Sequence, residues 1–327
     1  MRKQTKLVAV LSAAALLAIG ASMTSFAAKG WYEENGTWYY DKTGDGDLAS
    51  EEWRKSGNNW FWLDADGAMV TNQLIEDGKG NYFYVDANGA MVTNRWVAIE
   101  PGEDADEDAP AHYWYRFGSS GRALKAGSNS DIAIKTIDGK KYAFDSEGKM
   151  YYGWVSEDGD KQTEENPFAE ADYYFGDEDD GAMHTDWLQY NDGSDLESSL
   201  TGKAYEDQSV MWFFFDLSTG KMVKAEDGAS SSLKTKLVRG QRYAFDENGV
   251  MVYDWNNVTT PNNATSNNYF SSEDDGHLKK KGWIWAIPGV NINEEDHDSD
   301  TYRWFYVDGS GKTYTSNIKK VGTKRYE

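Results

Sequence analysis

The chain has 327 residues, no Cys, and 55 acidic against 33 basic residues, which gives a formal net charge of −22. Such a field repels nucleic acid and other polyanions, so the composition predicts no nucleic-acid partner. No disulfide framework is available to hold an exported protein together. Aromatic residues make up 15% of a chain that is only 39% hydrophobic, so Trp, Tyr and Phe are expected to serve both as core and as binding surface.

The first 27 residues have the pattern of a secretory signal peptide. Arg2, Lys3 and Lys6 precede an apolar stretch at 7–19, and residues 25–27 form a plausible cleavage site. An uncleaved membrane anchor is the alternative, but the apolar stretch is too short to span a bilayer comfortably. We therefore expect residues 1–27 to be removed and the mature protein to be secreted and not membrane-spanning.

A short phrase recurs along the rest of the chain: two or three aromatics, a turn ending in Gly, then Met or Leu. Residues 60–69 read WFWLDADGAM, and 82–91 read YFYVDANGAM, 22 residues later, with VTN following both times. Self-similarity at a fixed period indicates a stacked repeat architecture. Further copies centre on Gly121, Gly148, Gly181, Gly220, Gly249, Gly276 and Gly311.

A longer period overlies the short one. Residues 134–145 reappear in similar form at 235–246, 101 residues on, and a third copy begins at 318. The sequence therefore predicts regular 22-residue-type hairpin repeats over 28–99. Super-repeats of roughly the longer period, three hairpins each, are expected over 100–327, with the last copy truncated at Glu327.

Each phrase is expected to form a β-hairpin. The aromatics favour a strand, Asp-x-Asp/Asn-Gly favours a turn, and Ala-Met-Val-Thr is expected to return as the second strand. Because a lone hairpin is marginal in water, each unit must bury a face against the next. The predicted fold is all-β, an elongated solenoid of β-hairpin repeats with little helix. Acidic or polar stretches at 100–111, 156–170, 190–208, 256–268 and 288–300 are expected to be long solvated insertions.

The aromatic triplets, the Gly153-Trp154 and Gly282-Trp283 pairs and the GAMVTN segments closely resemble the choline-binding, or cell-wall-binding, repeats of Gram-positive surface proteins and autolysins. Related repeats in glucan-binding tails of glucosyltransferases and in clostridial toxins bind sugars instead. In the choline-binding family, the ligand sits between successive hairpins, boxed by the Trp after Gly and alternate aromatics of the next strand. Aromatic faces suit a quaternary ammonium group, which donates no hydrogen bonds.

The resemblance implies five ligand cages. They would be Trp53 with Trp60 and Trp62, Trp96 with Tyr113 and Tyr115, Trp154 with Tyr173 and Phe175, Trp187 with Trp212 and Phe214, and Trp283 with Trp304 and Tyr306. Middle aromatics such as Phe61 and Phe83 are expected to pack in the core, because alternate strand residues face opposite ways. Leu74 stands where a Trp is expected, Ser271 breaks the triplet after Trp255, and no Trp precedes Tyr142, so sites are expected to be missing there.

One segment fits a calcium-binding loop in part. Within the 12 residues 41–52, Asp41, Asp45, Asp47 and Glu52 occupy candidate ligand positions. That motif expects flanking helices, so an enlarged hairpin turn is the favoured interpretation. The four His show no metal-ligand spacing, and no nucleophile elbow, phosphate-binding loop or Cys site is present. The sequence predicts no cofactor and no catalytic centre.

Together these features predict a secreted, cell-wall-associated, non-catalytic repeat protein that binds choline or related wall-polymer groups in aromatic pockets. Two alternatives stay open. The same aromatics would support a carbohydrate (glucan)-binding array by stacking on sugar rings. The repeats would also suit the targeting region of an enzyme whose catalytic domain lies outside this chain. The sequence leaves the oligomeric state undetermined.

Overall fold

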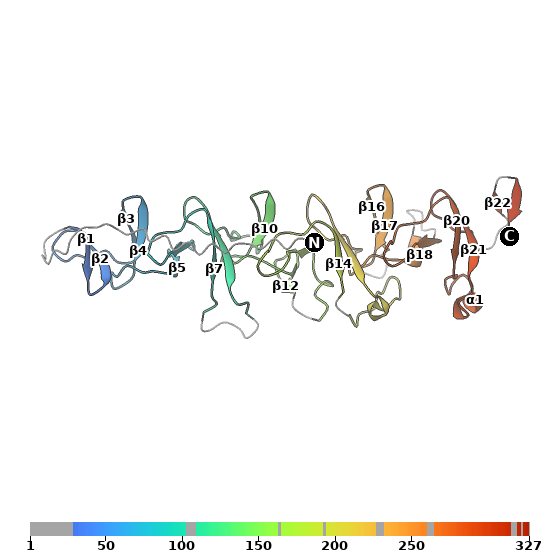
Figure 1. Ribbon diagram of the computed structural model, residues 1–327, viewed down its shortest axis with the longest axis horizontal. Coiled ribbons are helices and arrows are strands. Elements are labelled where there is room, and N and C mark those ends of the chain that lie inside the picture. Colours follow the sequence, from blue (N-terminus) through green and yellow to red (C-terminus); the bar gives the residue numbers. More distant parts are fainter. Residues whose placement is uncertain are drawn as a thin grey trace. The chain divides into compact units, whose positions relative to one another are not determined.

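The structure is a computed structural model that describes residues 29–102, 109–162, 165–191, 194–226, 232–259, 265–314, 319–321 and 323–326 (Figure 1). The predicted signal peptide at 1–27 lies outside these residues. The chain divides into two compact units. The first comprises Met1–Ala126 with Ser146–Met150, and the second comprises Gly127–Asp145 with Tyr151–Glu327.

Both units are built from small antiparallel sheets that follow one another along the chain. In the first unit the pairs are β1 (Gly30–Glu34) with β2 (Thr37–Asp41), β3 (Glu52–Ser56) with β4 (Asn59–Leu63), β5 (Gln73–Glu76) with β6 (Tyr82–Val85), and β7 (Arg95–Ile99) with β8 (Tyr113–Phe117). The second unit opens with β9 (Ala133–Ile137) and β10 (Lys140–Phe144), then a three-stranded sheet of β11 (Trp154–Val155), β12 (Lys161–Gln162) and β13 (Tyr173–Tyr174).

The second unit continues with β14 (Asp186–Tyr190) and β15 (Met211–Phe215), β16 (Lys234–Val238) and β17 (Gln241–Phe245), β18 (Asp254–Thr259) and β19 (Thr265–Phe270), β20 (Gly282–Ala286) and β21 (Arg303–Val307), and β22 (Lys319–Val321) and β23 (Lys324–Tyr326). In the described residues, helix is limited to the 3₁₀ turn η1 (Tyr205–Asp207) and to α1 (Glu294–Asp298). The predicted all-β fold of hairpin repeats is confirmed. No described helix has the length and apolar character needed to cross a membrane.

The pairing within each hairpin differs from the prediction. The aromatic strand β4 pairs with β3, the strand before it, and not with the Ala-Met-Val-Thr segment after it. That segment makes one isolated bridge, Leu63 to Met69. The reason is the Asp64 carboxylate, which accepts the backbone amides of Asp66 and Ala68 at 3.0 and 2.9 Å. This compact turn directs the chain away from its own hairpin after a single bridge.

The segment after each turn instead joins successive hairpins. The Met69 amide donates to the carbonyl of Trp38 in the preceding hairpin at 2.8 Å, and Val70 donates back to Trp62 in its own hairpin at 3.1 Å. The same bond recurs one hairpin later, from Met91 to Trp60 at 2.8 Å. In the second unit, Met222, Met251 and Leu278 donate in this way to Asp172, Trp212 and Arg242. Backbone hydrogen bonds therefore set the stacking of neighbouring hairpins.

The Gly and the Met of the phrase are needed for the same contact. Gly89 has φ +76°, and a Cβ added to it would lie 2.9 Å from Cε of Met69, in the preceding repeat. At Gly276, with φ +58°, an added Cβ would lie 2.3 Å from Sδ of Met251. A positive φ already favours Gly, and the Met leaves no room for a side chain. The same close contact between a Gly and the Met one repeat earlier is found at Gly89, Gly121, Gly220, Gly249 and Gly276.

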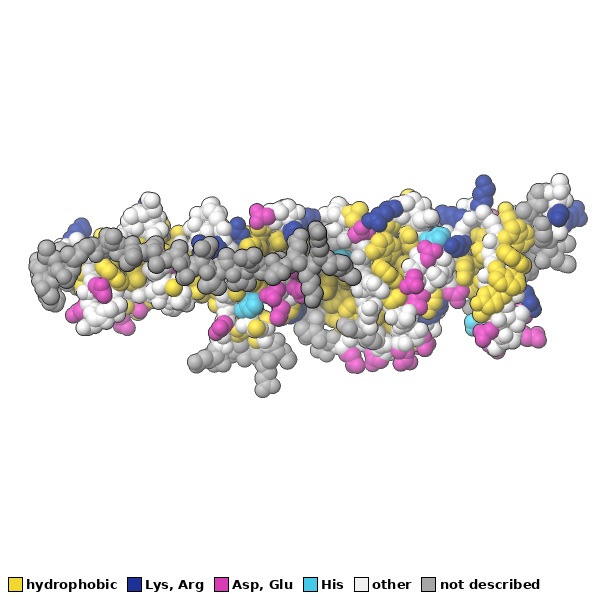
Figure 2. All heavy atoms as spheres, viewed as in Figure 1, with side chains coloured by type: hydrophobic (Ala, Val, Ile, Leu, Met, Phe, Trp, Pro, Cys, Tyr) yellow, Lys and Arg dark blue, Asp and Glu magenta, His cyan; other side chains and the backbone are white. Residues whose placement is uncertain are grey.

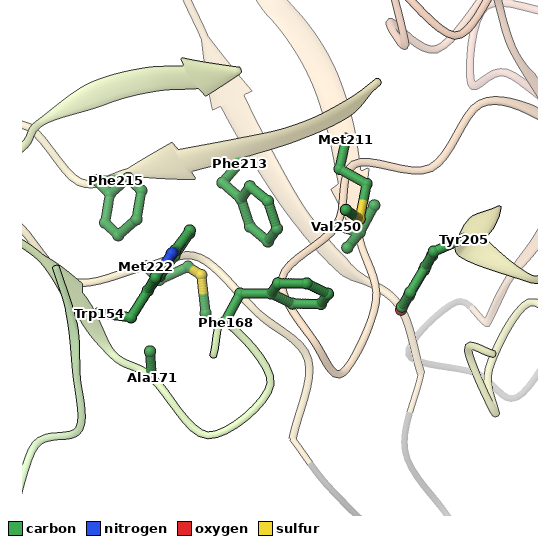
Figure 3. Packing of buried hydrophobic residues seen from close by; sticks show 9 residues of the cluster. All are labelled: Trp154, Phe168, Ala171, Tyr205, Met211, Phe213, Phe215, Met222 and Val250. Carbon is green, nitrogen blue, oxygen red and sulfur yellow. The ribbon is translucent and has the colours of Figure 1, made fainter. Parts of the chain in front are cut away.

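The hydrophobic core consists of separate clusters along the chain. Figure 3 shows one of them, in which Phe168, Phe213 and Phe215 lie around Trp154 and the buried Tyr205 packs against Phe168. Two of these rings, Phe168 and Tyr205, come from stretches predicted to be solvated loops, so that expectation is wrong for them. Their large apolar area is removed from water against the hairpins, which outweighs the polar character of the residues around them.

Two further predicted insertions also contain regular structure. The stretch 256–268 is occupied largely by β18 and β19. Its Asn-rich sequence has low β-propensity, yet Asn256 pairs with Asn268, whose Nδ2 donates to the Gly311 carbonyl at 2.8 Å. The stretch 288–300 contains α1, which Asn293 caps by accepting the Asp296 amide at 3.1 Å. Local hydrogen bonds therefore supply structure that hydrophobic periodicity did not indicate.

Candidate aromatic binding site

A group of three aromatic rings recurs between successive hairpins. In β3, Trp53 lies opposite Trp62 of β4, with ring centroids 5.3 Å apart and planes at 64°. Trp53 also meets Phe83, the middle aromatic of the next hairpin, at 5.2 Å and 62°. We call such a group an aromatic triad: a first-strand Trp, its cross-strand aromatic partner, and the middle aromatic of the following hairpin.

Four more triads have the same plan. They are Trp31 with Tyr40 and Phe61, Trp154 with Tyr174 and Phe213, Trp187 with Phe214 and Tyr243, and Trp255 with Tyr269 and Phe305. Across all five, the Trp ring lies 4.8–5.4 Å from each partner and inclined at 54–78°. Edge-to-face packing is favourable in itself, and two inclined rings form a corner with two π faces.

The first predicted cage is assembled in part. Trp53 and Trp62 are together and half-buried, as expected, while Trp60 lies opposite Lys55 with the ammonium 5.9 Å from its ring centroid. The third wall is Phe83, which was assigned to the core alone. Because Phe83 is buried and also closes the triad, one ring serves in both roles.

The predicted cage at Trp96 is wrong. The register of β7 and β8 places Trp96 opposite Arg116 and Tyr115 opposite Val97, so Tyr113 and Tyr115 are on the other face of the sheet. Tyr115 is buried in the hydrophobic cluster. The triplet in this hairpin is Trp114-Tyr115-Arg116, one residue later than predicted, and a one-residue shift exchanges the two faces. The position that would complete a triad is occupied by a cation.

The predicted cage at Trp154 is wrong for the same reason. Trp154 pairs with Tyr174, whereas Tyr173 and Phe175 belong to a separate cluster on the other face with Val155. In addition, Phe168 packs against Trp154 (Figure 3), with ring centroids 6.2 Å apart, and Trp154 is buried. An insertion therefore fills this triad with a side chain of the protein itself.

The two remaining predicted cages have their residues on one face. Trp187 lies 5.1 Å from Phe214 and 6.4 Å from Trp212, with Tyr243 of the next hairpin as third wall. Trp283 lies opposite Tyr306 at 5.2 Å. Trp304 faces Trp285 instead, and both indoles are more than half exposed.

Sequence reasoning missed the triads of Trp31 and Trp255. Trp31 follows Gly30, as Trp154 follows Gly153, and this signal could have identified it. Ser271 does not break the hairpin after Trp255, because the cross-strand partner is Tyr269, two residues earlier. Elsewhere, Leu74 lies opposite Tyr84 and Ile134 opposite Ala143, so neither of those first strands supplies the Trp of a triad.

The Tyr rings of the triads are uncharged, and one of the Trp side chains is held by a hydrogen bond. Burial raises the pKa of Tyr243 and of Tyr269 above the usual range, with nearby acidic groups adding to the effect. Both phenols therefore stay uncharged at neutral pH. The indole of Trp255 donates to the Ile287 carbonyl at 2.6 Å, whereas Nε1 of Trp53 and of Trp212 is buried with no hydrogen-bond partner in the structure as described.

The candidate calcium loop is not assembled. The Asp41 carboxylate accepts the amides of Thr43, Gly44 and Gly46 at 2.7–2.9 Å, and the bond from Gly44 contributes most to lowering its pKa. Lys42 pairs with Asp47, and Arg54 pairs with Glu52. Among the described residues, no group of three acidic, His or Cys side chains could hold a metal ion. Asp41 ends β2, Asp45 and Asp47 lie in the connection that follows, and Glu52 begins β3.

Residues 51–96 match the family model of the choline-binding repeat, which confirms the resemblance predicted from the aromatic phrase. Among solved structures, the chain is similar to the modular autolysin LytC of Streptococcus pneumoniae, with 19% identity over 91% of this chain and 50% of that chain and a TM-score of 0.47. It is also similar to choline binding protein F of Streptococcus pneumoniae, with 18% identity over 89% and 94% of the two chains and a TM-score of 0.39. The chain spans about half the length of the autolysin. No curated protein matches it.

Proposed function

We propose that this protein is secreted and attaches to the cell wall by binding choline, or a related quaternary ammonium group, on a wall polymer. The observation that carries the proposal is the triad of Trp53, Trp62 and Phe83, which lies inside the segment that matches the choline-binding repeat. Its three rings come from two successive hairpins and form the walls of the proposed site.

The chemistry of the ligand fits this site. A trimethylammonium group cannot donate a hydrogen bond, so its attraction comes from the negative faces of aromatic rings. At about 0.5–2 kcal/mol per ring, three rings give about 4 kcal/mol, which corresponds to about millimolar affinity. The net charge of −22 also favours cationic groups on the partner polymer.

A single triad binds weakly, but the repeats place several triads on one chain. A polymer that carries many choline groups can engage several triads of one chain, and linked binding raises avidity by about 10² to 10⁴ without new contacts. The triads of Trp31, Trp53, Trp187 and Trp255 are the candidates, because each has a half-buried Trp. The triad of Trp154 is the exception, because its Trp is buried and Phe168 packs against it.

Chromatography on two resins tests the proposal. One resin carries choline groups and the other carries primary ammonium groups at matched density. Because the protein is strongly acidic, both should retain it at low salt. High salt should release it from the primary ammonium resin only, since salt screens charge but does not weaken ring contacts in the same way. Free choline should then release it from the choline resin. Equal release from both resins by salt alone would sink the proposal.

A further inference from the structure

The hairpin of β20 and β21 exposes an unusual number of aromatic rings. Trp283, Trp285, Tyr302 and Trp304 are 38%, 52%, 47% and 63% exposed. Figure 2 shows the hydrophobic side chains gathered over these two strands on one face of the molecule. We call Trp285, Tyr302 and Trp304, with Trp283 beside them, the aromatic platform. Exposed rings in a continuous group are a common mark of a binding surface.

The Trp285 ring is less steeply inclined to its neighbours than the Trp rings of the triads are. Trp285 lies opposite Trp304 with centroids 5.2 Å apart and planes at 45°, and Tyr302 stacks on Trp285 at 5.8 Å with planes only 22° apart. Trp283 shares this face because it is two residues from Trp285 on the same strand.

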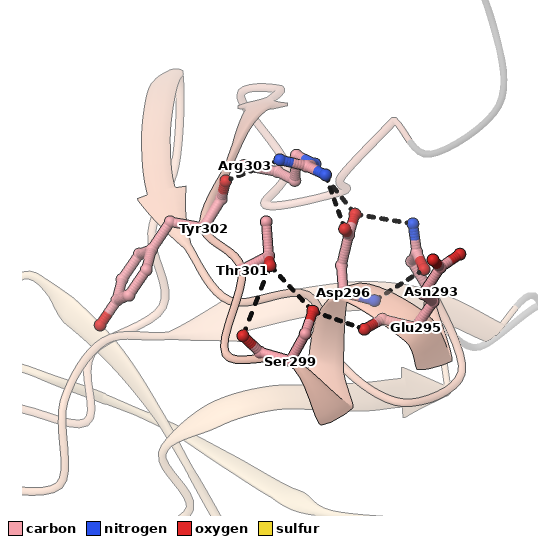
Figure 4. Close-up of polar contacts among 7 residues, drawn as sticks. All are labelled: Asn293, Glu295, Asp296, Ser299, Thr301, Tyr302 and Arg303. Atoms are coloured by element: carbon pink, nitrogen blue, oxygen red, sulfur yellow. Dashed lines mark hydrogen bonds and ion pairs between the residues drawn. The ribbon is translucent and has the colours of Figure 1, made fainter.

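The position of Tyr302 is fixed by the neighbouring insertion. Arg303 donates two hydrogen bonds of 2.6 and 2.9 Å to the Asp296 carboxylate, and Asn293 donates a third of 2.7 Å to the same carboxylate (Figure 4). His297 contacts the Pro288 carbonyl at 2.9 Å, which connects α1 to the segment just after β20. A bidentate pair to a buried Asp holds the start of β21 firmly. The platform is therefore preorganised, which lowers the entropy cost of binding.

We propose that the platform binds a neutral glycan, with the flat faces of its sugar rings stacked on Trp285, Tyr302 and Trp304. An extended chain of rings can contact several aromatics of an open surface at once, whereas a compact ammonium group would contact one or two and stay hydrated. The indole N–H and phenol O–H groups give polar rims for sugar hydroxyls. A net charge of −22 disfavours a polyanionic ligand. This site does not depend on choline binding by the triads.

The experiment is a titration of the whole chain with two neutral probes, isomaltononaose and the β-1,4-linked tetramer of N-acetylglucosamine, followed by calorimetry and by Trp fluorescence. We expect saturable binding of at least one probe at millimolar concentrations. Trp285→Ala and Trp304→Ala should each weaken it at least tenfold. Both indoles are more than half exposed, so neither change should unfold the protein, and thermal melting checks this.

A matched control is Tyr32→Ala, which removes one ring of another stacked pair, Tyr32 with Tyr39 at 5.6 Å and 23°. Glycan binding should be unchanged in this variant. The choline response of Trp285→Ala should also be unchanged, which separates this proposal from the function proposed above. Absence of binding by both probes would overturn the proposal, and so would equal losses in Tyr32→Ala and Trp285→Ala.

Discussion

The indole of Trp53 meets the phenyl ring of Phe83 edge to face, with ring centroids 5.2 Å apart, although the two residues belong to successive hairpins. This contact joins neighbouring repeats and also forms two walls of the proposed choline corner. Stability and ligand recognition therefore rest on the same rings. Mutations of triad residues should affect both properties. Mutations of exposed residues beside a triad should affect neither the stability of the protein nor the packing of its hairpins.

Phe83→Ala should destabilise the protein strongly. Phe83 is buried between Trp53 and Ile75, and loss of a buried Phe costs about 3–5 kcal/mol because a cavity remains. Trp60→Ala, at a ring that is 39% exposed, should cost much less, about 1 kcal/mol or below. Urea unfolding of both variants provides the comparison. Equal losses would mean that Phe83 does not hold the two hairpins together.

Gly276→Ala should be costly because of Met251. Gly57 and Gly276 share φ +58°, but an added Cβ meets nothing within 4 Å at Gly57 and lies 2.3 Å from Sδ of Met251 at Gly276. Gly57→Ala thus measures the backbone cost, and the excess in Gly276→Ala, about 1–3 kcal/mol, measures the clash. Met251→Ala should therefore cost less stability in the Gly276→Ala background than in the native protein. Identical urea midpoints for the two Gly variants would show that Met251 does not pack closely against Gly276.

Arg116→Tyr should give Trp96 an aromatic partner. The register places residue 116 opposite Trp96, where other hairpins carry an aromatic ring. The variant should show a larger choline-dependent change in Trp emission than the native protein, and adding Trp96→Ala should return the change to its native size. Tyr115→Ala should lower stability, since Tyr115 is buried, without adding or removing a choline response. A choline response lost in Tyr115→Ala at unchanged stability would contradict the register.

Stability should fall as the pH rises through neutrality because of Asp246. Burial raises the pKa of this carboxyl to about 7, although the Tyr205 hydroxyl, at 2.6 Å, and the Val250 amide, at 2.8 Å, lower it. The folded state therefore holds a proton that the unfolded chain has already lost above about pH 4. This contribution is complete below that value and is lost as the pH rises through the folded pKa.

Asp246→Asn keeps the shape of the protonated acid and removes its titration. Urea midpoints measured from about pH 5 to about pH 8 should fall for the native protein and stay flatter for the variant. The advantage of the variant should therefore grow with pH. A difference that stays constant over this range would show that Asp246 does not titrate there.

Much of the fold was predictable because the phrase repeats its chemistry. Aromatic strands, Asp-Gly turns and the inward position of Phe61 and Phe83 follow from propensity and alternation. The strand partner was not predictable in the same way. The Asp64 carboxylate stabilises the turn, and the Met69 amide donates to the preceding hairpin. These contacts determine the strand partner, and the local sequence pattern does not predict them.

The candidate site was predictable where the triplet was unambiguous, as at Trp53 and Trp187. The prediction failed at Trp96 and Trp154, where the partner segments contain the runs YWYRF at 113–117 and YYF at 173–175, and the register differs by one residue from the assumed one. The packing of Phe168 into the Trp154 triad could not be predicted from the sequence either, because a single apolar residue in a polar stretch gives no periodic signal.

The central claim is that triads bind choline, and one titration tests it most directly: choline is added to the native protein, Trp53→Ala and Trp96→Ala while Trp emission is recorded. The account predicts a saturable change in the millimolar range for the native protein, reduced in Trp53→Ala and retained in Trp96→Ala. No change in emission up to tens of millimolar choline, or equal losses in the two variants, would contradict it.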